Sequence, residues 1–171
     1  MLGELITSKT RLRLLIKFFI SQANKGYLNG LASEMGESTN AIRKELNHLY
    51  SAGYLIKLKN NNKVEYTANT KHPLFETLQK IVLKHLGLED IVQSVLERMG
   101  DLEKIVLVGD YARGIDSGVV EVFLIGSGLN ADYIAQLEPK IEQLTGRDIN
   151  LYIGTKFSSK QPNIILYDKT A

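Results

Sequence analysis

The chain has 171 residues, of which 44% are hydrophobic and 23% charged, and its formal net charge is +2. These proportions are typical of a globular protein of one ordinary domain or two small ones, and they exclude a collagen-like, coiled-coil or wholly disordered chain. The sequence contains no cysteine. That excludes disulfides, thiolate zinc sites, iron–sulfur clusters and thiol nucleophiles.

No apolar run in the sequence reaches the roughly 18 to 20 residues that a membrane span requires. Residues 1–17 interleave Lys and Arg with Leu and Ile, and no small-residue cleavage site follows them. This pattern predicts an amphipathic helix and not a signal peptide. We therefore expect a cytoplasmic protein without a membrane partner.

The charge is distributed unevenly along the chain. Residues 1–72 hold 11 Lys and Arg against 5 Asp and Glu, a net charge of +6, whereas residues 73–171 have a net charge of −4. A basic module joined to an acidic one indicates nucleic-acid contact by the first, because charge of one sign steers a polyanion.

A helix-turn-helix spacing is predicted in the basic half. An amphipathic helix over residues 8–22 has Ser8 as its N-cap and an apolar stripe at steps of three and four. Asn29 is expected to cap a short second helix that ends at Gly36, in a left-handed conformation. After a short turn, Ser38 or Thr39 can cap a third helix.

The third predicted helix has two different faces. Its apolar face carries Ile42, Leu46 and Leu49, and the opposite face is polar. The polar and flanking side chains are Asn40, Arg43, Lys44, Asn47, His48 and Ser51. Amide and cationic groups on such a face can reach base edges and phosphates in a major groove, although a merely solvated face has the same composition.

A β-hairpin is predicted after the third helix. The β-prone segments 54–59 and 63–67 are separated by three asparagines, which tolerate left-handed turn conformations. Lys57, Lys59 and Lys63 surround the expected tip of this hairpin. The basic half thus combines a helix-turn-helix with a basic hairpin.

This order of elements resembles the winged helix-turn-helix domain of bacterial transcriptional regulators over about residues 8–70. The segment from Leu46 to Ile56 is similar to the end of a recognition helix that runs into a wing. The resemblance implies that the third helix enters the major groove of double-stranded DNA and that the wing meets the backbone or minor groove. It implies DNA contacts by Ser38, Thr39, Asn40, Arg43, Lys44, Asn47, His48, Lys57, Lys59, Asn61 and Lys63.

Metal sensing is not expected, because the metal-sensing members of that family use Cys or His clusters. The three histidines, His48, His72 and His85, lack the i, i+4 spacing of a helical metal site. We interpret each of them as a structural or surface histidine.

Two amphipathic helices are predicted between the halves, one starting at Pro73 and one at Leu88, with Gly87 between them. Their apolar stripes could pack on either module or pair with a second subunit, and a simple spacer is the alternative. We expect a homodimer through the helices of residues 73–99, because helix-turn-helix dimers read paired half-sites.

The acidic half begins with two predicted strands, residues 104–108 and 119–125, joined by a glycine-bounded loop over residues 109–114. The sequence of this loop, Gly-Asp-Tyr-Ala-Arg-Gly, resembles the minimal nucleotidyltransferases of the DNA polymerase beta superfamily. That family has a "GSxARG" loop, followed by "SD-x-D" at the start of the next strand. The resemblance covers roughly residues 100–154 and includes the helix end, "GR" turn and third strand over residues 144–153. It implies a nucleotide site at Gly109, Asp110, Arg113, Gly114 and Glu121.

That implied site departs from the family pattern. Val119 and Glu121 stand where the family has its metal-binding carboxylates, Asp110 replaces the loop serine, and Asn150 stands where an acid is common. Since paired carboxylates hold the Mg²⁺ of this chemistry, we expect no catalysis, no metal and no cofactor. A different cluster of Asp110, Asp116 and Glu121 is the alternative.

Three smaller expectations concern the acidic half. Arg113 either contacts a phosphate or pairs with Asp110 or Asp116. Pro139 is expected to break the helix predicted over residues 132–144. Residues 163–168 are expected to form a last edge strand.

The sequence thus predicts a two-domain protein of mixed α+β and α/β class. We expect a winged helix-turn-helix over residues 1–71, linker or dimerisation helices over 72–100, and a small mixed-sheet, nucleotidyltransferase-like domain over 101–171. The expected function is a sequence-specific DNA-binding transcriptional regulator whose second domain serves interaction or sensing, with a protein or nucleotide partner. The alternatives are a Mg²⁺-dependent nucleotidyltransferase and a non-catalytic subunit of a toxin–antitoxin-like pair.

Overall fold

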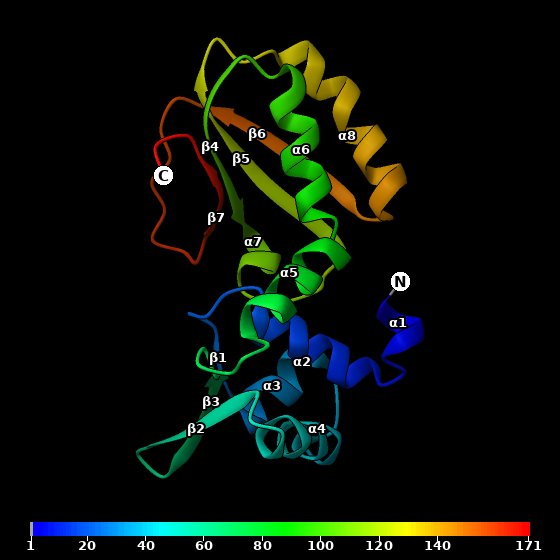
Figure 1. Cartoon of the computed structure of the whole chain (residues 1–171), viewed down its shortest axis with the longest axis vertical. Helices are drawn as coiled ribbons and strands as arrows, with labels where there is room; N and C mark the ends of the chain where they lie inside the picture. The colour runs from blue at the N-terminus through cyan, green and yellow to red at the C-terminus, as the bar shows by residue number, and fades with distance from the viewer. Residues whose placement is uncertain (1) are drawn as a thin grey trace. The chain divides into compact units, whose positions relative to one another are not determined.

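The computed structural model describes residues 2–171 and divides the chain into two compact units, Met1–His85 and Leu86–Ala171. Each unit combines helices with one sheet (Figure 1). Among the described residues, every helix is too short or too polar to cross a membrane.

Unit 1 is built from five helices and three strands among its described residues. They are α1 (Leu2–Leu5), α2 (Lys9–Phe19), β1 (Lys25–Tyr27), α3 (Leu28–Met35), α4 (Thr39–Ser51), β2 (Leu55–Asn60), β3 (Lys63–Ala68) and α5 (Phe75–His85). The strands form an antiparallel sheet in the order β1-β3-β2. A helix, a short strand, a helix-turn-helix and a hairpin in this order are the winged helix-turn-helix topology.

The core of unit 1 lies where α2 meets α4 and α5. Leu14, Ile16 and Phe18 of α2 are fully buried, as are Ile42 and Leu46 of α4. The Phe19 ring packs against Phe75 at the start of α5, with the ring centroids 5.7 Å apart. The apolar stripes expected from the sequence therefore do face one another.

Helix ends in unit 1 follow side-chain capping. The hydroxyls of Ser8 and Ser38 accept the backbone N–H of Arg11 and Ala41, and Gly36 ends α3 with φ of 63°. Asn29 is not a cap, contrary to expectation. It lies in the first turn of α3, because the chain enters this helix directly from β1 and Tyr27 takes the capping position.

Two other helix boundaries in unit 1 differ from the predicted ones. The predicted amphipathic helix at the N-terminus is divided, since α1 ends at Leu5 and α2 begins only after its cap, Ser8. Helix α5 begins at Phe75 and not at Pro73, because the backbone N–H groups of Leu74 and Phe75 donate to His72 in a turn.

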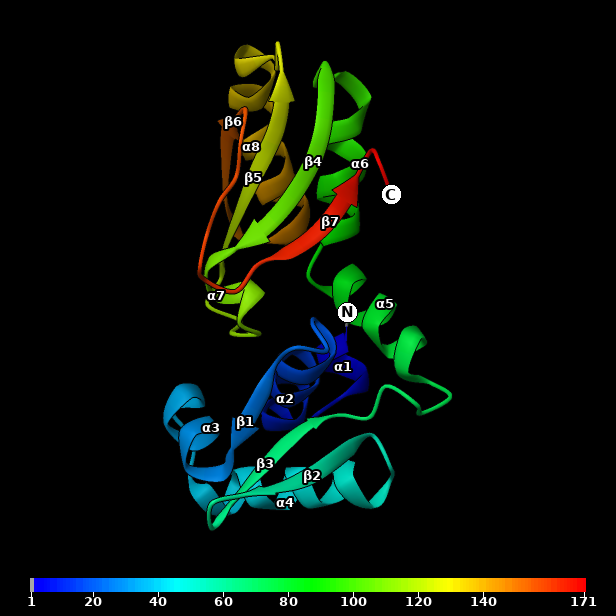
Figure 2. The same ribbon diagram turned by 90° about the vertical axis from the view of Figure 1, so that its left-hand side faces the viewer.

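Unit 2 has a four-stranded sheet with two long helices. Its elements are α6 (Leu88–Arg98), β4 (Asp101–Val108), α7 (Gly109–Ala112), β5 (Val119–Ser127), α8 (Ala131–Thr145), β6 (Asp148–Gly154) and β7 (Ile164–Asp168). The strand order is β6-β5-β4-β7, with β5 and β6 parallel and the other pairs antiparallel. In Figure 2 one face of this sheet is open toward the viewer, and α6 and α8 lie behind it.

The covered face of this sheet holds the core of unit 2. Val120, Val122 and Leu124 of β5 are completely buried, together with Ile91 and Val95 of α6. The alternate residues of β5, including Glu121 and Phe123, lie on the open face and are half-buried. The period of two along β5 thus separates a packed face from an accessible one.

Helix α8 is continuous from Ala131 to Thr145, so the predicted break at Pro139 is wrong. Pro139 is exposed, while Ile134, Leu137 and Ile141 on the opposite side of α8 are buried. Packing on both sides of the proline stabilises the helix through a position that would interrupt an isolated one.

The two helices expected to form one linker belong to different units. Helix α5 packs on α2 within unit 1, whereas α6 packs on α8 within unit 2. The α6 stripe expected at a dimer interface, Leu88, Ile91 and Val95, is at most 1% exposed because the core of unit 2 already covers it. These α6 side chains are therefore not a dimerisation surface.

Candidate nucleic-acid interface

The polar face of α4 lies at the surface of unit 1. All seven residues expected to contact DNA from this region are exposed: Ser38, Thr39, Asn40, Arg43, Lys44, Asn47 and His48. The Arg43 guanidinium donates to the amide oxygen of Asn40 at 3.3 Å, which aligns these two side chains along one edge of the helix. The face thus offers amide, hydroxyl and cationic groups to a partner.

A buried carboxylate fixes α4 against α2. Glu45 accepts a hydrogen bond from Arg11 Nε at 2.8 Å and one from the Ser8 hydroxyl at 2.9 Å, and its side chain is 8% exposed. Burial raises the pKa of Glu45, but the hydrogen bonds from Arg11 and Ser8 outweigh burial and leave the pKa below its usual value.

The same contact reaches the exposed face of α4. His48 Nδ1 lies 3.6 Å from the Glu45 carboxylate and 3.4 Å from the Arg11 guanidinium. Sequence reasoning missed Arg11 and Glu45. The sequence did contain one indication of this contact, because Glu45 is the single acidic residue of an otherwise basic and amide-rich helix.

The hairpin of β2 and β3 is a wing with a two-residue turn. Asn61 and Asn62 adopt φ of 45° and 66°, the left-handed conformation that matches the twist of paired strands. The predicted contact residues of the wing, Lys57, Lys59, Asn61 and Lys63, are all exposed. The hairpin expected from the sequence is therefore present, with its lysines at the surface.

The wing lysines differ in their surroundings. Lys57 Nζ lies 3.9 Å from the centroid of the Tyr50 ring on α4 and 5.6 Å from that of Tyr66. Lys63 Nζ lies 5.9 Å from the Tyr27 ring centroid, whereas no such contact is found for Lys59 among the described residues. Lys57 thus joins the wing to α4, and Lys59 projects without an aromatic partner.

A groove of about 440 Å³ opens beside the wing. It is lined by the start of α3 and by the wing tip: Tyr27, Leu28, Asn29, Gly30, Asn62, Lys63, Val64 and Tyr66. At its rim the Tyr27 hydroxyl donates to Glu65 at 2.8 Å, and Lys25 pairs with the same carboxylate at 3.2 Å. These two contacts tie β1, a strand missed in the sequence, to the wing.

In unit 2 the residues of the implied nucleotide site lie in α7, in the turn directly after it, and on β5. Gly109, with φ of 68°, lies directly under the Glu121 carboxylate, and a side chain at position 109 would collide with it. Asp110 and Arg113 form an ion pair with each other, as one of the two interpretations of Arg113 expected. Gly114 closes the turn in a left-handed conformation.

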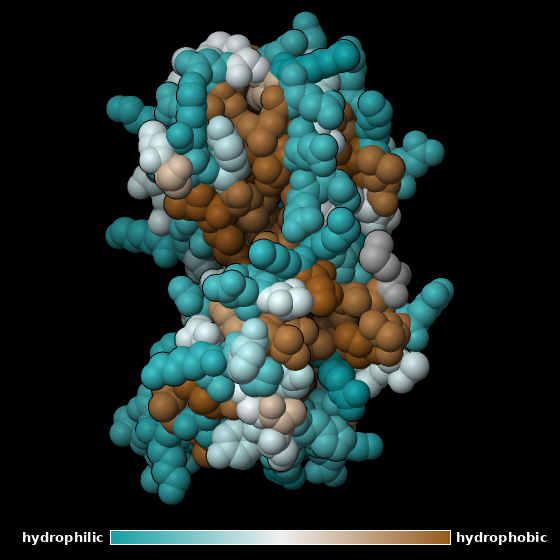
Figure 3. All heavy atoms as spheres, viewed as in Figure 1, coloured by the Kyte–Doolittle hydropathy of each residue, from teal (hydrophilic) through white to brown (hydrophobic). Residues whose placement is uncertain are grey.

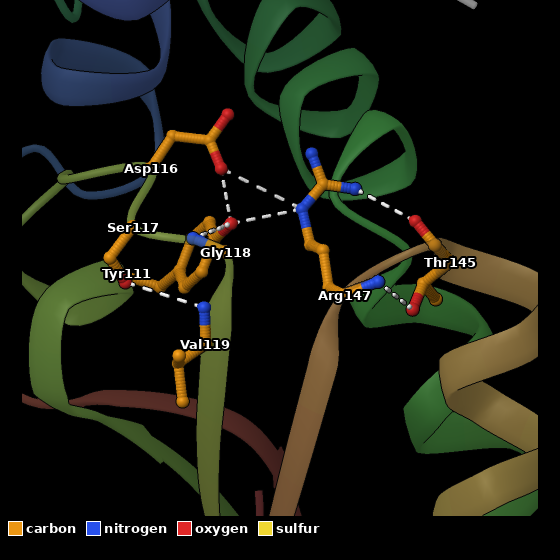
Figure 4. A network of polar contacts seen from close by, with 7 residues as sticks. All are labelled: Tyr111, Asp116, Ser117, Gly118, Val119, Thr145 and Arg147. Carbon is orange, nitrogen blue, oxygen red and sulfur yellow. Dashed lines mark hydrogen bonds and ion pairs between the residues drawn. The ribbon is translucent and has the colours of Figure 1, made fainter.

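A buried tyrosine holds the segment between α7 and β5 (Figure 4). The Tyr111 hydroxyl donates to Asp116 and accepts hydrogen bonds from Arg147 Nε at 2.9 Å and from the Gly118 backbone at 3.2 Å. Arg147 also donates to the Thr145 carbonyl at 3.2 Å. Burial and the neighbouring Asp116 carboxylate raise the pKa of Tyr111 to about 12.

The alternative metal cluster of Asp110, Asp116 and Glu121 is not assembled. Asp110 pairs with Arg113, and Asp116 lies with Tyr111 and Arg147, 3.7 Å from the guanidinium. Within residues 2–171 no group of three or more His, Asp or Glu side chains is placed to hold a metal ion. Asn150 of β6 is the cross-strand partner of Glu121 and supplies an amide there.

Comparisons with known proteins give little guidance. No family model matches the chain, and no curated protein matches it either. Reduced HlyU from Vibrio cholerae N16961 is 19% identical, with a TM-score of 0.39, over 48% of this chain and 82% of that one. The AntR antimony-specific transcriptional repressor is 20% identical, also with a TM-score of 0.39, over 53% and 81%. TM-scores and identities this low do not support any statement about the function of this chain.

Proposed function

We propose that this chain is a sequence-specific DNA-binding transcriptional regulator. Unit 1 binds duplex DNA, with α4 in the major groove and the wing on the backbone or in the minor groove. Unit 2 is a nucleotidyltransferase-like domain without transfer activity that serves interaction or sensing. The observation that carries this proposal is the exposed amide and cationic face of α4 beside a wing with exposed lysines.

The chemistry of the two parts of this surface differs. Asn47 and Arg43 on α4 carry the amide and guanidinium groups that can form paired hydrogen bonds with base edges. Lys59 and Lys63 on the wing are point charges suited to phosphates, which fix the position of a protein without reading sequence. We therefore assign sequence preference to α4 and general affinity to the wing.

The DNA test separates these roles by binding measurements at several salt concentrations, with genomic duplex fragments. Lys59→Ala combined with Lys63→Ala should weaken binding about equally for all sequences and reduce the salt slope by roughly one for each phosphate that the variant no longer neutralises. Asn47→Ala should instead change sequence preference, at a cost of about 1 to 3 kcal/mol at the affected base pair.

Lys140→Ala is the matched control, because Lys140 is exposed on α8 of unit 2 and belongs to none of α4, the wing and α5. It should leave affinity and salt slope close to those of the unmodified protein. A protein without measurable affinity for any duplex at low salt contradicts the proposal, and so does equal loss of binding in the control.

We also propose a homodimer that forms through α5 and not through α6, because the apolar stripe of α6 is buried within unit 2. Leu74, directly before α5, and Ile81 on α5 are 45% and 40% exposed. Figure 3 shows that apolar side chains also reach the surface elsewhere on the molecule, among hydrophilic ones. Two-fold symmetry would suit paired half-sites about one DNA turn apart. Light scattering at micromolar concentration should give the dimer mass, and Ile81→Asp should give the monomer. A monomer for the unmodified protein, with and without DNA, contradicts the dimer.

The absence of transfer activity in unit 2 is proposed from its side chains. Val119 has no metal-binding atom, Asp110 already pairs with Arg113, and Asp116 lies beside Arg147. A single carboxylate, Glu121, then has to hold Mg²⁺ where the chemistry uses a pair, and most of the electrostatic stabilisation of the transition state is missing.

The transfer test uses labelled nucleoside triphosphates with Mg²⁺ or Mn²⁺ and with tRNA, protein and antibiotic acceptors. We expect no label transfer. Transfer that Glu121→Ala abolishes would establish the Mg²⁺-dependent nucleotidyltransferase instead. Stable capture of one protein partner by unit 2, without transfer and without DNA binding, would establish the toxin–antitoxin-like subunit.

A further inference from the structure

A groove of about 430 Å³ lies on the open face of the unit 2 sheet. Its floor is the end of β4 and the middle of β5, and its wall is the segment that leads from β6 to β7. In Figure 2 this segment runs along the side of β5 and β6 toward α7. A volume of this size is within the range that small-molecule sites have.

The groove contains one acid and one base that are not paired with each other or with other charged groups. The Glu121 carboxylate receives only a weak contact from the Tyr152 hydroxyl at 3.5 Å, and no ion pair is found for it among the described residues. Lys156 also lines the groove and has no carboxylate partner within residues 2–171. Two other acids of the same sheet do have cationic partners, since Asp168 pairs with Lys104 at 3.0 Å and Asp101 pairs with Lys169 at 2.7 Å.

The acid is held in place by its surroundings. Gly109 has no side chain and a left-handed backbone, and the Glu121 carboxylate occupies the space that a Cβ atom at position 109 would fill. Glu121 is half-buried and projects from a strand of the central sheet. A half-buried carboxylate in this position, for which no ion pair is found among the described residues, favours a ligand with a positive charge.

The apolar part of the groove is aromatic. Phe123 and Phe157 both line it, with ring centroids 5.3 Å apart and ring planes tilted by 51°. Phe123 also packs against Tyr152 on the neighbouring strand, with centroids 5.0 Å apart. Both phenylalanines are half-buried, so part of each ring is accessible to a flat apolar group.

We propose that this groove binds a small aromatic zwitterion of the amino-acid type. Its ring packs on Phe123 and Phe157, its ammonium group pairs with Glu121, and its carboxylate pairs with Lys156. The inference rests on the proposed role of unit 2 as a sensing domain, and it adds the chemical class of the ligand. No bond is made or broken in this binding.

The test uses L-tryptophan as the probe and the full chain without DNA. The protein contains no tryptophan, so the fluorescence anisotropy of the probe reports binding when its indole is excited at wavelengths that the tyrosines of the protein do not absorb. Tryptamine lacks the carboxylate and indole-3-propionate lacks the amine. We expect both to bind about fivefold more weakly than L-tryptophan, as for the loss of one partly exposed ion pair.

Two substitutions identify which charge meets which group. Glu121→Gln should weaken the binding of L-tryptophan and tryptamine by about fivefold and leave that of indole-3-propionate unchanged. Lys156→Gln should weaken the binding of L-tryptophan and indole-3-propionate by about fivefold and leave that of tryptamine unchanged. The matched controls are Lys160→Gln, in the same segment, and Glu97→Gln on α6. Both residues are exposed and neither lines the groove, so all three probes should bind as before.

Three results would overturn the proposal. They are no anisotropy change at millimolar L-tryptophan, binding that neither substitution affects, and stronger binding of AMP than of L-tryptophan, which would indicate a nucleotide ligand. Because DNA affinity and label transfer are measured in separate assays, failure of this proposal is distinguishable from failure of the proposed function.

Discussion

The two units use their polar side chains in opposite ways. On α4 and the wing of unit 1, the amide and cationic groups project from the surface. The buried Glu45 beneath them accepts hydrogen bonds from Ser8 and Arg11 of another part of the unit. In unit 2, by contrast, polar groups of the segment between β4 and β5 bind one another and a residue before β6, as Tyr111 and Asp116 do with Arg147. The comparison shows that a polar motif indicates a binding surface when its groups stay exposed, and a structural network when they are buried and bind one another.

The largest expected effect concerns the internal network of unit 2. Tyr111→Ala should lower the free energy of unfolding by about 4 kcal/mol, because it removes a fully buried ring and leaves a cavity. Tyr111→Phe keeps the ring and should cost about 2 kcal/mol, since Arg147 and the Gly118 N–H lose their acceptor.

Hydrogen exchange followed by mass spectrometry locates this effect. Protection should fall in β4, β5 and β6 and remain unchanged in α2 and α4. The control is Tyr167→Phe, because no hydrogen bond of the Tyr167 hydroxyl is found among the described residues, and it should change stability little. Equal stability of the Tyr111→Phe and unmodified proteins would contradict a structural role for this network.

The same tyrosine predicts a loss of stability in alkali. The pKa of Tyr111 is raised in the folded protein from an ordinary value of 10.0 to about 12. The neutral phenol therefore stabilises the fold fully below pH 10, and this contribution is lost as the pH rises toward 12. Tyrosinate absorbance should show a late titration step that is absent from Tyr111→Phe. A titration identical in the two proteins would count against it.

A smaller effect is expected at Glu45, the buried carboxylate that joins α4 to α2 in unit 1. Glu45→Ala should cost about 2 kcal/mol, because Arg11 and Ser8 lose their shared acceptor. The pKa of Glu45 is lowered in the folded protein from an ordinary value of 4.5. The ionised carboxylate therefore stabilises the fold above that pH, and this stabilisation is lost as the pH falls below it. Urea unfolding at neutral pH and at about pH 3 to 4 should therefore give a smaller difference between variant and parent in acid.

Glu37→Ala is the matched control for Glu45. Glu37 pairs with Arg13 at 3.2 Å, but both side chains are more exposed than Glu45. The substitution should cost about 0.5 kcal/mol or less. If Glu45→Ala cost no more than this control, the buried contact would not be what fixes α4 against α2.

The smallest effect separates two lysines of the wing. Lys57→Met should lower stability by about 0.5 kcal/mol, because its ammonium group lies over the Tyr50 ring. Lys59→Met should leave stability unchanged and weaken DNA binding. Thermal unfolding and DNA titration of both variants check this assignment, and a reversed pattern would assign the DNA contact to Lys57.

Features fixed by neighbouring residues were predictable from the sequence. Ser8 and Ser38 cap their helices, Gly36 ends one, and the asparagines form the wing turn, because each depends on only a few adjacent backbone groups. The edge strand β7 and the helix-turn-helix were expected for similar reasons.

Features fixed by distant partners were not predictable. Strand β1 has three residues without an alternating pattern and exists because β3 pairs with it. Helix α8 continues through Pro139 because buried side chains on both sides hold it. The apolar stripe of α6 indicated a buried face, but not that the partner is α8 within the same chain. At the site, α4 and the wing were expected, whereas Arg11 and Glu45 beneath them were not.

The position of Glu121 over Gly109 links two residues that lie twelve places apart in the sequence. A side chain at position 109 has room only if the acid at 121 is shortened or turned away, and its left-handed backbone adds a further penalty. Substitutions at the two positions should therefore be epistatic, and a pairwise mutational library would find Gly109→Ala less harmful when Glu121 is Ala than when it is Glu. Among natural sequences of this protein, the two positions would be expected to covary.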